Sequence, residues 1–482
     1  MIGLVVNPVA GVGGPAGLAG SDGADVQRLA LKRGAQSRVQ ERTAAALAVI
    51  AAQHPGLVVL TAEGAMGADA VRAAGLEPRV VYAAGAVLAS SPPSARVVAE
   101  CTARSRRDAV HSTRSGVLGE AKTATDAADT SRAVAAVAAA GADLVLVVGG
   151  DGTLRDAARA LTSPAPGLEA AAAAADPFTT PQKSPVPMRY RSNQADSGPS
   201  LRSYEHSVPE PSTGSAAGRP PFQSADHRPA VLGIPAGVKM YSPVFAVSPS
   251  AAGAIASDWV TRDGLPTDER EVLDIDEAAM RRAHVEPTLY GMLRVPYRPG
   301  RTQARKAPTP ATEAAAVAVA ARGVVASMRT GVRYLLGPGG TTAEVARQLG
   351  IDATPLGVDV VLDGVVVRAA ASEQELLAET SRGPAQAVVT VIGGQGFLLG
   401  RGNQQLSASV LRALGDEPLL VVAPEQKLID LRGRPLIVDT GDLDLDARLA
   451  GHVRVITGVG ASSQYAVVAP ELQLAASAHR SL

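Results

Sequence analysis

The chain has 482 residues, more than one hydrophobic core usually serves, which predicts two domains. Lys and Arg number 46 and Asp and Glu also 46, so the net charge of +0 gives no basic surplus for nucleic acid or an anionic membrane. The single cysteine, Cys101, excludes an intramolecular disulfide and a cysteine-rich metal site.

The first part of the chain alternates between short apolar runs and helical patterns. Strand-like runs are expected at 2–7, 57–60 and 79–82. Helical patterns are expected around 26–30 and over 41–53 and 68–74. Strands and helices that alternate at this spacing predict βαβ units and a parallel sheet, hence an α/β fold.

An alanine-rich helix over 126–140 and a strand over 143–148 continue this alternation. The turn Gly149-Gly150-Asp151-Gly152-Thr153 follows, and a helix is expected over 154–161. Two stretches interrupt the pattern. Residues 88–121 are predicted to be a loop insertion, and residues 163–229, rich in Pro, Ser, Ala and Gln, are predicted to be disordered because they lack the apolar surface that would offset their ordering entropy.

The second half resumes with a strand at 230–235 and extended segments at 244–247 and 286–298. Helices are expected over 312–328, 343–349 and 407–414, and strands over 333–336, 387–392, 419–422 and 436–438. The predicted organisation is an N-terminal α/β domain over 1–162, the insertion over 163–229, and the rest of the fold with a C-terminal substrate domain over 230–482.

The loop 149–153 carries the strongest chemical signal. Glycines at a strand-to-helix turn let backbone amides approach phosphate oxygens, and the helix N-terminus adds partial positive charge. Asp151 contributes a carboxylate that could take a proton from a hydroxyl nucleophile or help hold Mg²⁺. Its ordinary pKa, about 3.9, keeps it ionised at neutral pH. The simpler alternative is a tight turn with an aspartate cap.

Three further loops leave a nucleotide-binding role and a structural role open. Gly11 to Ala16 fits a GxGxxA pattern after a strand, but no acidic residue follows at the expected spacing, so a plain turn is the alternative. In Gly337 to Thr342, Thr341 or Thr342 could cap the next helix or join exposed amides in an anion pocket. Lys239 could meet a phosphate or be an ordinary surface lysine.

The segment Gly393 to Gln405 combines several glycines with Arg401, Asn403 and two glutamines. Planar guanidinium and amide donors suit phosphate and amide groups of a ligand. A solvated turn would not require so many glycines around one arginine. The pattern therefore favours a binding role for this segment.

Together these loops resemble the ATP-NAD kinase family, in the branch related to the acetoin-catabolism X-type proteins. The resemblance covers most of the chain outside the two insertions. It rests on Asn7-Pro8 and the glycines after it, 20–23 (GSDG), 149–153 (GGDGT), 233–240 (GIPAGVKM), 271–277 (EVLDIDE), 337–342 (GPGGTT), 393–405 and 431–435 (LRGRP). The GGDGT loop alone is shared with diacylglycerol, sphingosine and phosphofructo-type kinases.

The resemblance implies an active site completed between an N-terminal α/β domain and a C-terminal domain. ATP, or polyphosphate, would be the phosphoryl donor with Mg²⁺, and the adenosine ribose 2′-hydroxyl of NAD would be the acceptor. Asp151 would be the base or activating carboxylate. The residues expected to contact the nucleotides are Gly149, Gly150, Gly152, Thr153, Asn7, Gly13, Lys239, Gly339, Thr341, Thr342, Arg401 and Asn403.

The sequence departs from the family pattern in its two insertions, in the absence of an Asn-Glu pair of the kind that holds NAD, and in Gly340, where a polar residue is expected. Two alternatives follow: a related kinase with a lipid or small polyol acceptor, or a nucleotide-binding regulator without turnover. The expected partners are small-molecule nucleotides, without nucleic acid or membrane, in a cytoplasmic homo-oligomer.

Overall fold

The computed structural model describes residues 1–18, 24–84, 125–162, 228–274, 288–298, 300–303 and 313–472, which belong to one compact unit. The predictions for 88–121 and 163–227, the motif at 20–23 and Cys101 lie outside the described residues.

The N-terminal part contains a five-stranded sheet in the order β3-β2-β1-β4-β5, in which all neighbours are parallel. The strands are β1 (Ile2–Val6), β2 (Val58–Ala62), β3 (Glu77–Tyr82), β4 (Leu144–Gly149) and β5 (Ala230–Pro235). Every residue of β1, β4 and β5 is buried, which explains why these strands read as continuous apolar runs. The predicted parallel α/β sheet is confirmed.

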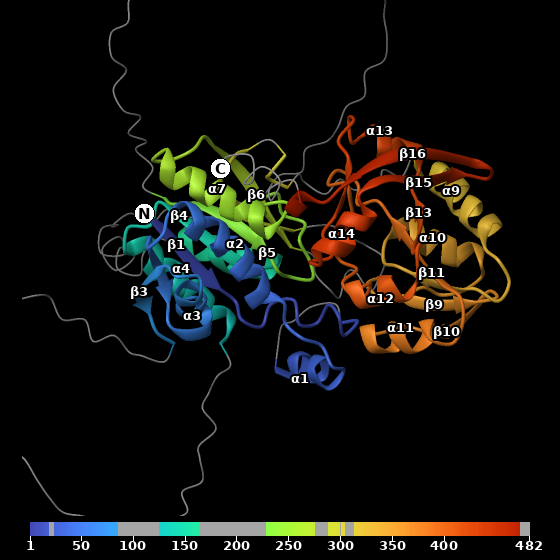
Figure 1. The fold of residues 1–482 in the computed structure, drawn as a ribbon, viewed down its shortest axis with the longest axis horizontal. Coiled ribbons are helices and arrows are strands. Elements are labelled where there is room, and N and C mark those ends of the chain that lie inside the picture. The colour runs from blue at the N-terminus through green and yellow to red at the C-terminus, as the bar shows by residue number, and fades with distance from the viewer. Residues whose placement is uncertain are drawn as a thin grey trace, which may run out of the picture. The chain divides into compact units, whose positions relative to one another are not determined.

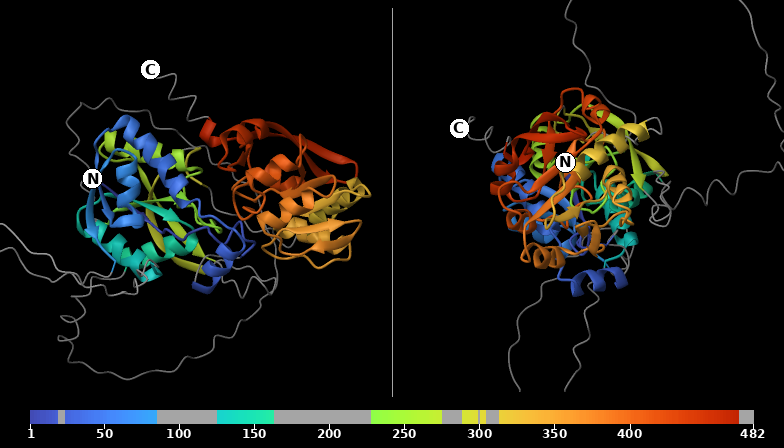
Figure 2. Two further views of the ribbon diagram at one scale, coloured as in Figure 1. Left: turned by 60° about the horizontal axis from the view of Figure 1, so that its bottom comes forward. Right: turned by 90° about the vertical axis from the view of Figure 1, so that its right-hand side faces the viewer.

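Helices cover both faces of this sheet (Figures 1 and 2). On one face α2 (Val39–Gln53) packs against α7 (Pro249–Thr261), and on the other α4 (Ala127–Ala139) packs against α5 (Asp151–Thr162). The contact of α2 with α7 is close because Gly253 lacks a Cβ, which would lie 2.3 Å from the carbonyl oxygen of Ala46. The small side chains of the sequence thus allow backbone-to-backbone packing of helices.

Three shorter elements and one hairpin complete this part. They are α1 (Ala24–Lys32), the 3₁₀ turn η1 (Gly64–Met66), α3 (Ala68–Ala73), and the antiparallel pair β6 (Thr267–Asp274) and β7 (Thr288–Pro296). The described helix α5 begins at Asp151 rather than at 154, so the second half of the GGDGT loop is already helical.

The C-terminal part contains a nine-stranded mixed sheet in the order β10-β9-β8-β11-β13-β15-β16-β14-β12. Its strands are β8 (Arg333–Leu336), β9 (Asp359–Leu362), β10 (Val365–Arg368), β11 (Ala385–Thr390), β12 (Phe397–Leu399), β13 (Leu419–Val422), β14 (Leu436–Val438), β15 (Gly451–Gly458) and β16 (Ala461–Val468). Strands β8, β11, β13 and β15 are parallel neighbours, and β15 forms an antiparallel hairpin with β16.

Helices lie on both faces of the mixed sheet as well (Figure 1). They are α9 (Ala314–Ser327), α10 (Gly340–Gln348), α11 (Glu373–Thr380), α12 (Ala408–Ala413), α13 (Glu425–Ile429) and α14 (Leu443–Leu449). Helices α9 and α10 share one apolar cluster with the sheet, and α11 and α12 contribute to another. Among the described helices, none is long and apolar enough to cross a membrane.

Candidate active site

The turn between β4 and α5 places Asp151 in the first turn of the helix, buried at 1% exposure. Its amide donates to the carbonyl oxygen of Lys239 at 3.0 Å. Its carboxylate accepts the amide of Tyr241 at 2.5 Å and both the amide and the hydroxyl of Ser242, at 3.0 and 2.6 Å. Asp151 therefore fastens the segment after β5, residues 236–242, to the glycine turn.

The pKa of Asp151 differs from the sequence-based expectation. Burial raises it to about 6, although the hydrogen bonds from Ser242 and Tyr241 lower it, and the nearby carboxylate of Asp274 adds to the rise. The expectation of an ordinary pKa near 3.9 is therefore wrong, because the carboxylate lies out of solvent. At pH 7 the group is still mainly ionised, and a pKa close to the working pH suits a general base.

Two glycines let the backbone of the turn touch the 236–242 segment. A Cβ on Gly237 would lie 2.2 Å from the Cα of Gly150, and one on Gly150 would lie 2.9 Å from the carbonyl oxygen of Lys239. Gly11, with φ of +73°, approaches from the N-terminal turn, where a Cβ would lie 2.2 Å from the carbonyl oxygen of Ala236. Only glycine at these positions permits the approach of three loops.

Gly237→Ala is expected to lower the free energy of unfolding by about 1–3 kcal/mol, because the added methyl would have to push rigid backbone apart. Chemical denaturation measures the change. Gly291→Ala is the matched control, since a Cβ there meets only Ala158 Cβ at an ordinary 3.5 Å. Equal stability of the two variants would contradict the close-approach argument.

Asn7 and Thr153, both predicted to contact nucleotide, instead bond to each other. The amide nitrogen of Asn7 lies 3.1 Å from the hydroxyl of Thr153, and the side-chain oxygen of Asn7 accepts the amide of Val9. A Cβ on Gly149 would lie 2.2 Å from that Thr153 hydroxyl, so Gly149 makes room for it. Gly13 lies in the N-terminal turn, where its carbonyl accepts the amide of Leu18. These residues shape the loops, and a contact with nucleotide stays a prediction.

Arg401, predicted to contact nucleotide, has a buried guanidinium. The residue is 4% exposed, and the guanidinium donates to Asp439 Oδ2 at 2.8 Å and to the carbonyl oxygen of Val247 at 2.9 Å. Arg42 from α2 donates to both oxygens of the same carboxylate, at 2.9 and 3.1 Å. The expected role of Arg401 as a nucleotide contact is therefore corrected: its donors are occupied within the protein.

The two arginines of the Arg42–Asp439–Arg401 triad lower the pKa of the aspartate between them. Burial alone would raise the pKa of Asp439, but the charges and hydrogen bonds of the two arginines outweigh it and hold the pKa at about 2. Arg42 also donates to the carbonyl oxygen of Pro235 at the end of β5. The triad thus joins the N-terminal sheet to loops of the C-terminal part. Sequence reasoning missed it because the partners are 38 and 397 residues apart.

Asn403 is likewise a structural residue of its loop. Its amide donates to the carbonyl oxygen of Leu398 at 2.7 Å, and its oxygen accepts the amide of Gly400 at 3.1 Å. At 7% exposure it offers no open face to a ligand. The prediction that Asn403 contacts nucleotide is therefore corrected as well, because its hydrogen-bonding groups close the turn.

The Gly337–Thr342 loop joins β8 to α10. Gly339 is the N-cap of α10, so Thr341 and Thr342 lie inside the helix and the capping interpretation is wrong. Both threonines are 1% exposed; Thr342 donates to the carbonyl oxygen of Gly339, and Thr341 accepts the ammonium of Lys427 at 3.1 Å. Burial lowers the pKa of Lys427. The anion-pocket interpretation of this loop stays a prediction.

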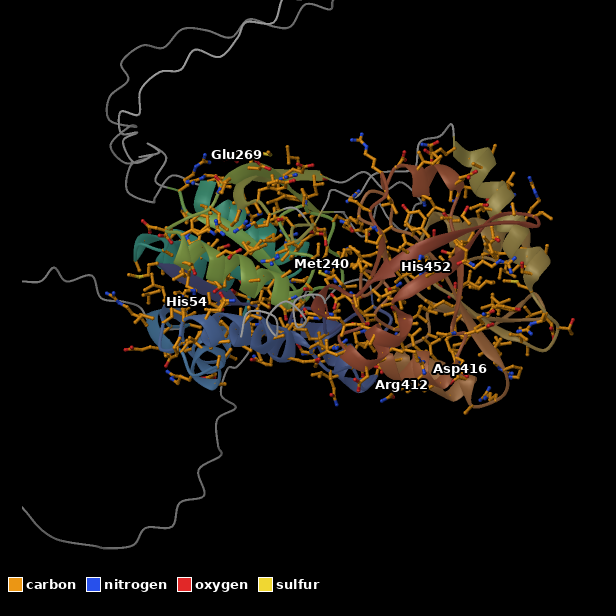
Figure 3. The ribbon with its side chains drawn as sticks, turned by 45° about the horizontal axis from the view of Figure 1, so that its top comes forward. His54, Met240, Glu269, Arg412, Asp416 and His452 are labelled. Atoms are coloured by element: carbon orange, nitrogen blue, oxygen red, sulfur yellow. The ribbon has the colours of Figure 1, made fainter. Side chains whose placement is uncertain are left out.

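A cavity of about 540 Å³, within the usual range for small-molecule sites, adjoins the N-terminal glycine turn and the 236–242 segment. Its walls come from the N-terminal turn, the start of α2, the 236–242 segment and the loops at 400–409 and 439–442. Gly237 and Met240 line it (Met240 is labelled in Figure 3), whereas Asp151 does not. Since Gly237 also contacts Gly150, the segment forms a single layer of backbone between the cavity and the glycine turn.

The described residues do not form a metal site of their own. No group of three His, Cys, Asp or Glu side chains suited to a metal ion occurs among them. Both oxygens of Asp151, for which the sequence left open a role in holding Mg²⁺, already accept hydrogen bonds. We therefore assign no Mg²⁺ ligand within the part of the chain that the structure describes.

These features define a two-part α/β protein in which the 236–242 segment contacts a glycine-rich strand-to-helix turn and also lines a cavity of small-molecule size. The ATP-NAD kinase N-terminal domain matches residues 2–168, and the ATP-NAD kinase C-terminal domain matches residues 329–467. The chain belongs to the ATP-NAD kinase family. Neither the comparison with curated proteins nor the one with solved structures finds a match.

Proposed function

We propose that the protein is an NAD kinase, which transfers the terminal phosphoryl group of ATP or polyphosphate to the adenosine ribose 2′-hydroxyl of NAD. The observation that carries the proposal is the juxtaposition of the β4–α5 glycine turn, the 236–242 segment and the adjoining cavity in a chain of this family. Phosphoryl transfer requires mainly positioning and charge stabilisation, which backbone amides at such a turn can supply.

Asp151 is the proposed base. The Ser242 hydroxyl that donates to Asp151 Oδ1 also lies 3.0 Å from the carbonyl oxygen of Leu273. Because a hydroxyl has one proton, turning it toward Leu273 removes one donor from the carboxylate. An acceptor hydroxyl that reaches Asp151 can then take its place, and its proton passes to the carboxylate as its oxygen attacks the phosphorus. The bond from phosphorus to the leaving phosphate oxygen breaks in the same transfer.

The residues proposed to contact the phosphates are Gly149, Gly150, Gly152 and Gly13 in the glycine turns and Lys239 in the segment opposite. The carbonyl of Lys239 accepts the Asp151 amide, which fixes its backbone beside the turn. Gly339, Thr341 and Thr342 are proposed as a second nucleotide contact, supported by the neighbouring ammonium of Lys427.

The experiment that tests the function is NADP formation by purified protein given NAD, ATP and Mg²⁺, with polyphosphate as a parallel donor. NADP formation in proportion to enzyme is the expected result. ATP binding without NADP would contradict the NAD acceptor. Screening other hydroxyl acceptors, including diacylglycerol and small polyols, would then separate a related kinase from a regulator. The regulator has one observation in its favour, namely that Asp151 does not line the cavity.

A further inference from the structure

Three glutamine side chains hold the carbonyl groups of the 236–242 segment. The amide nitrogen of Gln404 lies 3.1 Å from the carbonyl oxygen of Gly237. The amide nitrogens of Gln303 and Gln395 lie 2.9 and 3.2 Å from the carbonyl oxygen of Met240. Gln395 and Gln404 come from the glycine-rich stretch of the C-terminal part, so residues far apart in the sequence fix one short piece of backbone.

Three amides of the same segment have no such partner, whereas those of Tyr241 and Ser242 donate to Asp151. The N–H groups of Gly237, Val238 and Met240 donate no hydrogen bond to any residue that the structure describes. Gly237 and Met240 are buried. Buried amides are nearly always paired, and an unpaired one costs about 1–3 kcal/mol. The two buried donors of Gly237 and Met240, with the half-buried one of Val238 between them, indicate an acceptor that is not part of the described chain.

The position of the unpaired amides next to the cavity indicates which kind of group would accept their hydrogen bonds. Gly237 lines the cavity and at the same time contacts the backbone of Gly150 in the glycine turn. Gln404, whose amide nitrogen holds the Gly237 carbonyl, lines the cavity too. An anion in the cavity beside the turn would accept the free amides. Oriented backbone N–H groups in succession are a common phosphate-binding arrangement.

We propose that Gln303, Gln395 and Gln404 are positioning residues that hold the carbonyls of the 236–242 segment away from the cavity, so that its amides bind the phosphoryl groups of the nucleotide donor. The inference rests on the proposed function, in that it takes the cavity as the nucleotide site. If the glutamines served only to join the two parts of the chain, the amides would have no reason to stay unpaired.

The test compares Gln404→Met and Gln395→Met with the wild type. Methionine keeps the side-chain length but removes the donor. Calorimetric titration with inorganic tripolyphosphate and with ATP is expected to show a Kd raised about tenfold in each variant, equivalent to about 1.4 kcal/mol. In turnover the KM for ATP should rise while the KM for NAD and the thermal midpoint stay close to wild type, a split that general loosening of the fold would not produce.

Gln386→Met is the matched control, because the Gln386 amide also donates to a backbone carbonyl, that of Glu417, at 3.1 Å but on β11. Wild-type affinity for both ligands in both test variants would overturn the proposal. So would an equal loss of affinity in the control, or unfolding of both variants, which would make the glutamines structural. A wild type that binds tripolyphosphate but forms no NADP would overturn only the proposed function, since the binding comparison would still decide the role of the glutamines.

Discussion

Asp151→Asn is expected to lower kcat for NADP formation by about 10²–10⁴-fold, the range typical for removal of a general base. The asparagine amide has nearly the size of the carboxyl group, and its oxygen can still accept the amide of Ser242, although its nitrogen cannot accept that of Tyr241. It cannot take a proton from the acceptor hydroxyl. The KM for ATP should stay within a few-fold of wild type. Steady-state kinetics with each substrate varied in turn measures both quantities.

The pH dependence separates this role from a purely structural one. Because the pKa of Asp151 is raised to about 6, kcat/KM of the wild type should fall as pH drops through about 6, and the asparagine variant should lack this step. The carboxyl has a higher pKa in the folded than in the unfolded chain, where it is 3.8. Its contribution to stability is therefore full below pH 3.8 and is lost as the pH rises through about 6. The free energies of unfolding of the asparagine variant and the wild type should therefore be most alike at about pH 7.5, which is the pH at which their activities are best compared.

Asp126→Asn is the control, since it makes the same substitution at a helix start, the N-cap of α4, where the carboxylate accepts the amide of Asp129 and does not contact the 236–242 segment. It should keep its activity, because asparagine caps a helix about as well as aspartate. Near-normal turnover of Asp151→Asn would contradict the base role. A large rise in the KM for ATP with kcat preserved would instead show that Asp151 acts by holding the 236–242 segment.

The sequence was sufficient to predict the N-terminal sheet and the glycine turn. Strands β1 and β4 are fully buried, so their apolar runs are uninterrupted, and glycines mark the end of β4. These are local signals, and hydrophobic periodicity captures them. The helix over 249–261 escaped prediction although its signals were present: Ser248 accepts the amide of Ala251 as the N-cap, and Pro249 opens the first turn.

The side chains of the site were harder to predict than the elements that carry them. A sequence shows that Arg401 is an arginine beside glycines, but its burial depends on Asp439 and Arg42, which reach it from distant elements. The same holds for Asp151, whose pKa is raised by burial and whose hydrogen-bond donors lie in a segment about 90 residues away. Ion pairs between residues far apart in the sequence, and the burial of side chains by distant segments, do not produce a periodic sequence pattern. The chemistry of each site residue could therefore be established only from the structure.

The C-terminal part illustrates a related difficulty. Strand β10 exposes Val365 and Val367, at 63% and 39%, and β15 and β16 alternate little between buried and exposed faces. Strands of this kind pair with neighbours but bury no complete face, so the period of two that predicts a half-buried strand is weak. Strands β10, β15 and β16 were therefore not expected from the sequence, whereas the more buried strands β8, β11, β13 and β14 were.

Asp439→Ala is expected to lower the free energy of unfolding by about 3–5 kcal/mol, because it leaves two buried guanidinium groups without their shared carboxylate. Both arginines lie within 3.0 Å of Asp439 oxygens, and the carboxylate side chain is 1% exposed. Denaturant-induced unfolding measures the loss. Since the pKa of Asp439 is lowered to about 2, the stabilisation should be present above pH 3.8 and disappear as the pH falls toward 2.

The exposed pair of Asp69 and Arg72, also joined at 3.0 Å, supplies the control, since its side chains are 61% and 57% exposed. Asp69→Ala should change stability by no more than about 1 kcal/mol, because water and salt screen such a pair. Combining Asp439→Ala with Arg401→Met should recover part of the loss, since one uncompensated cation is removed together with its partner. If Asp439→Ala were no more destabilising than Asp69→Ala, the triad would not be what joins α2 and β5 to the loops of the C-terminal part.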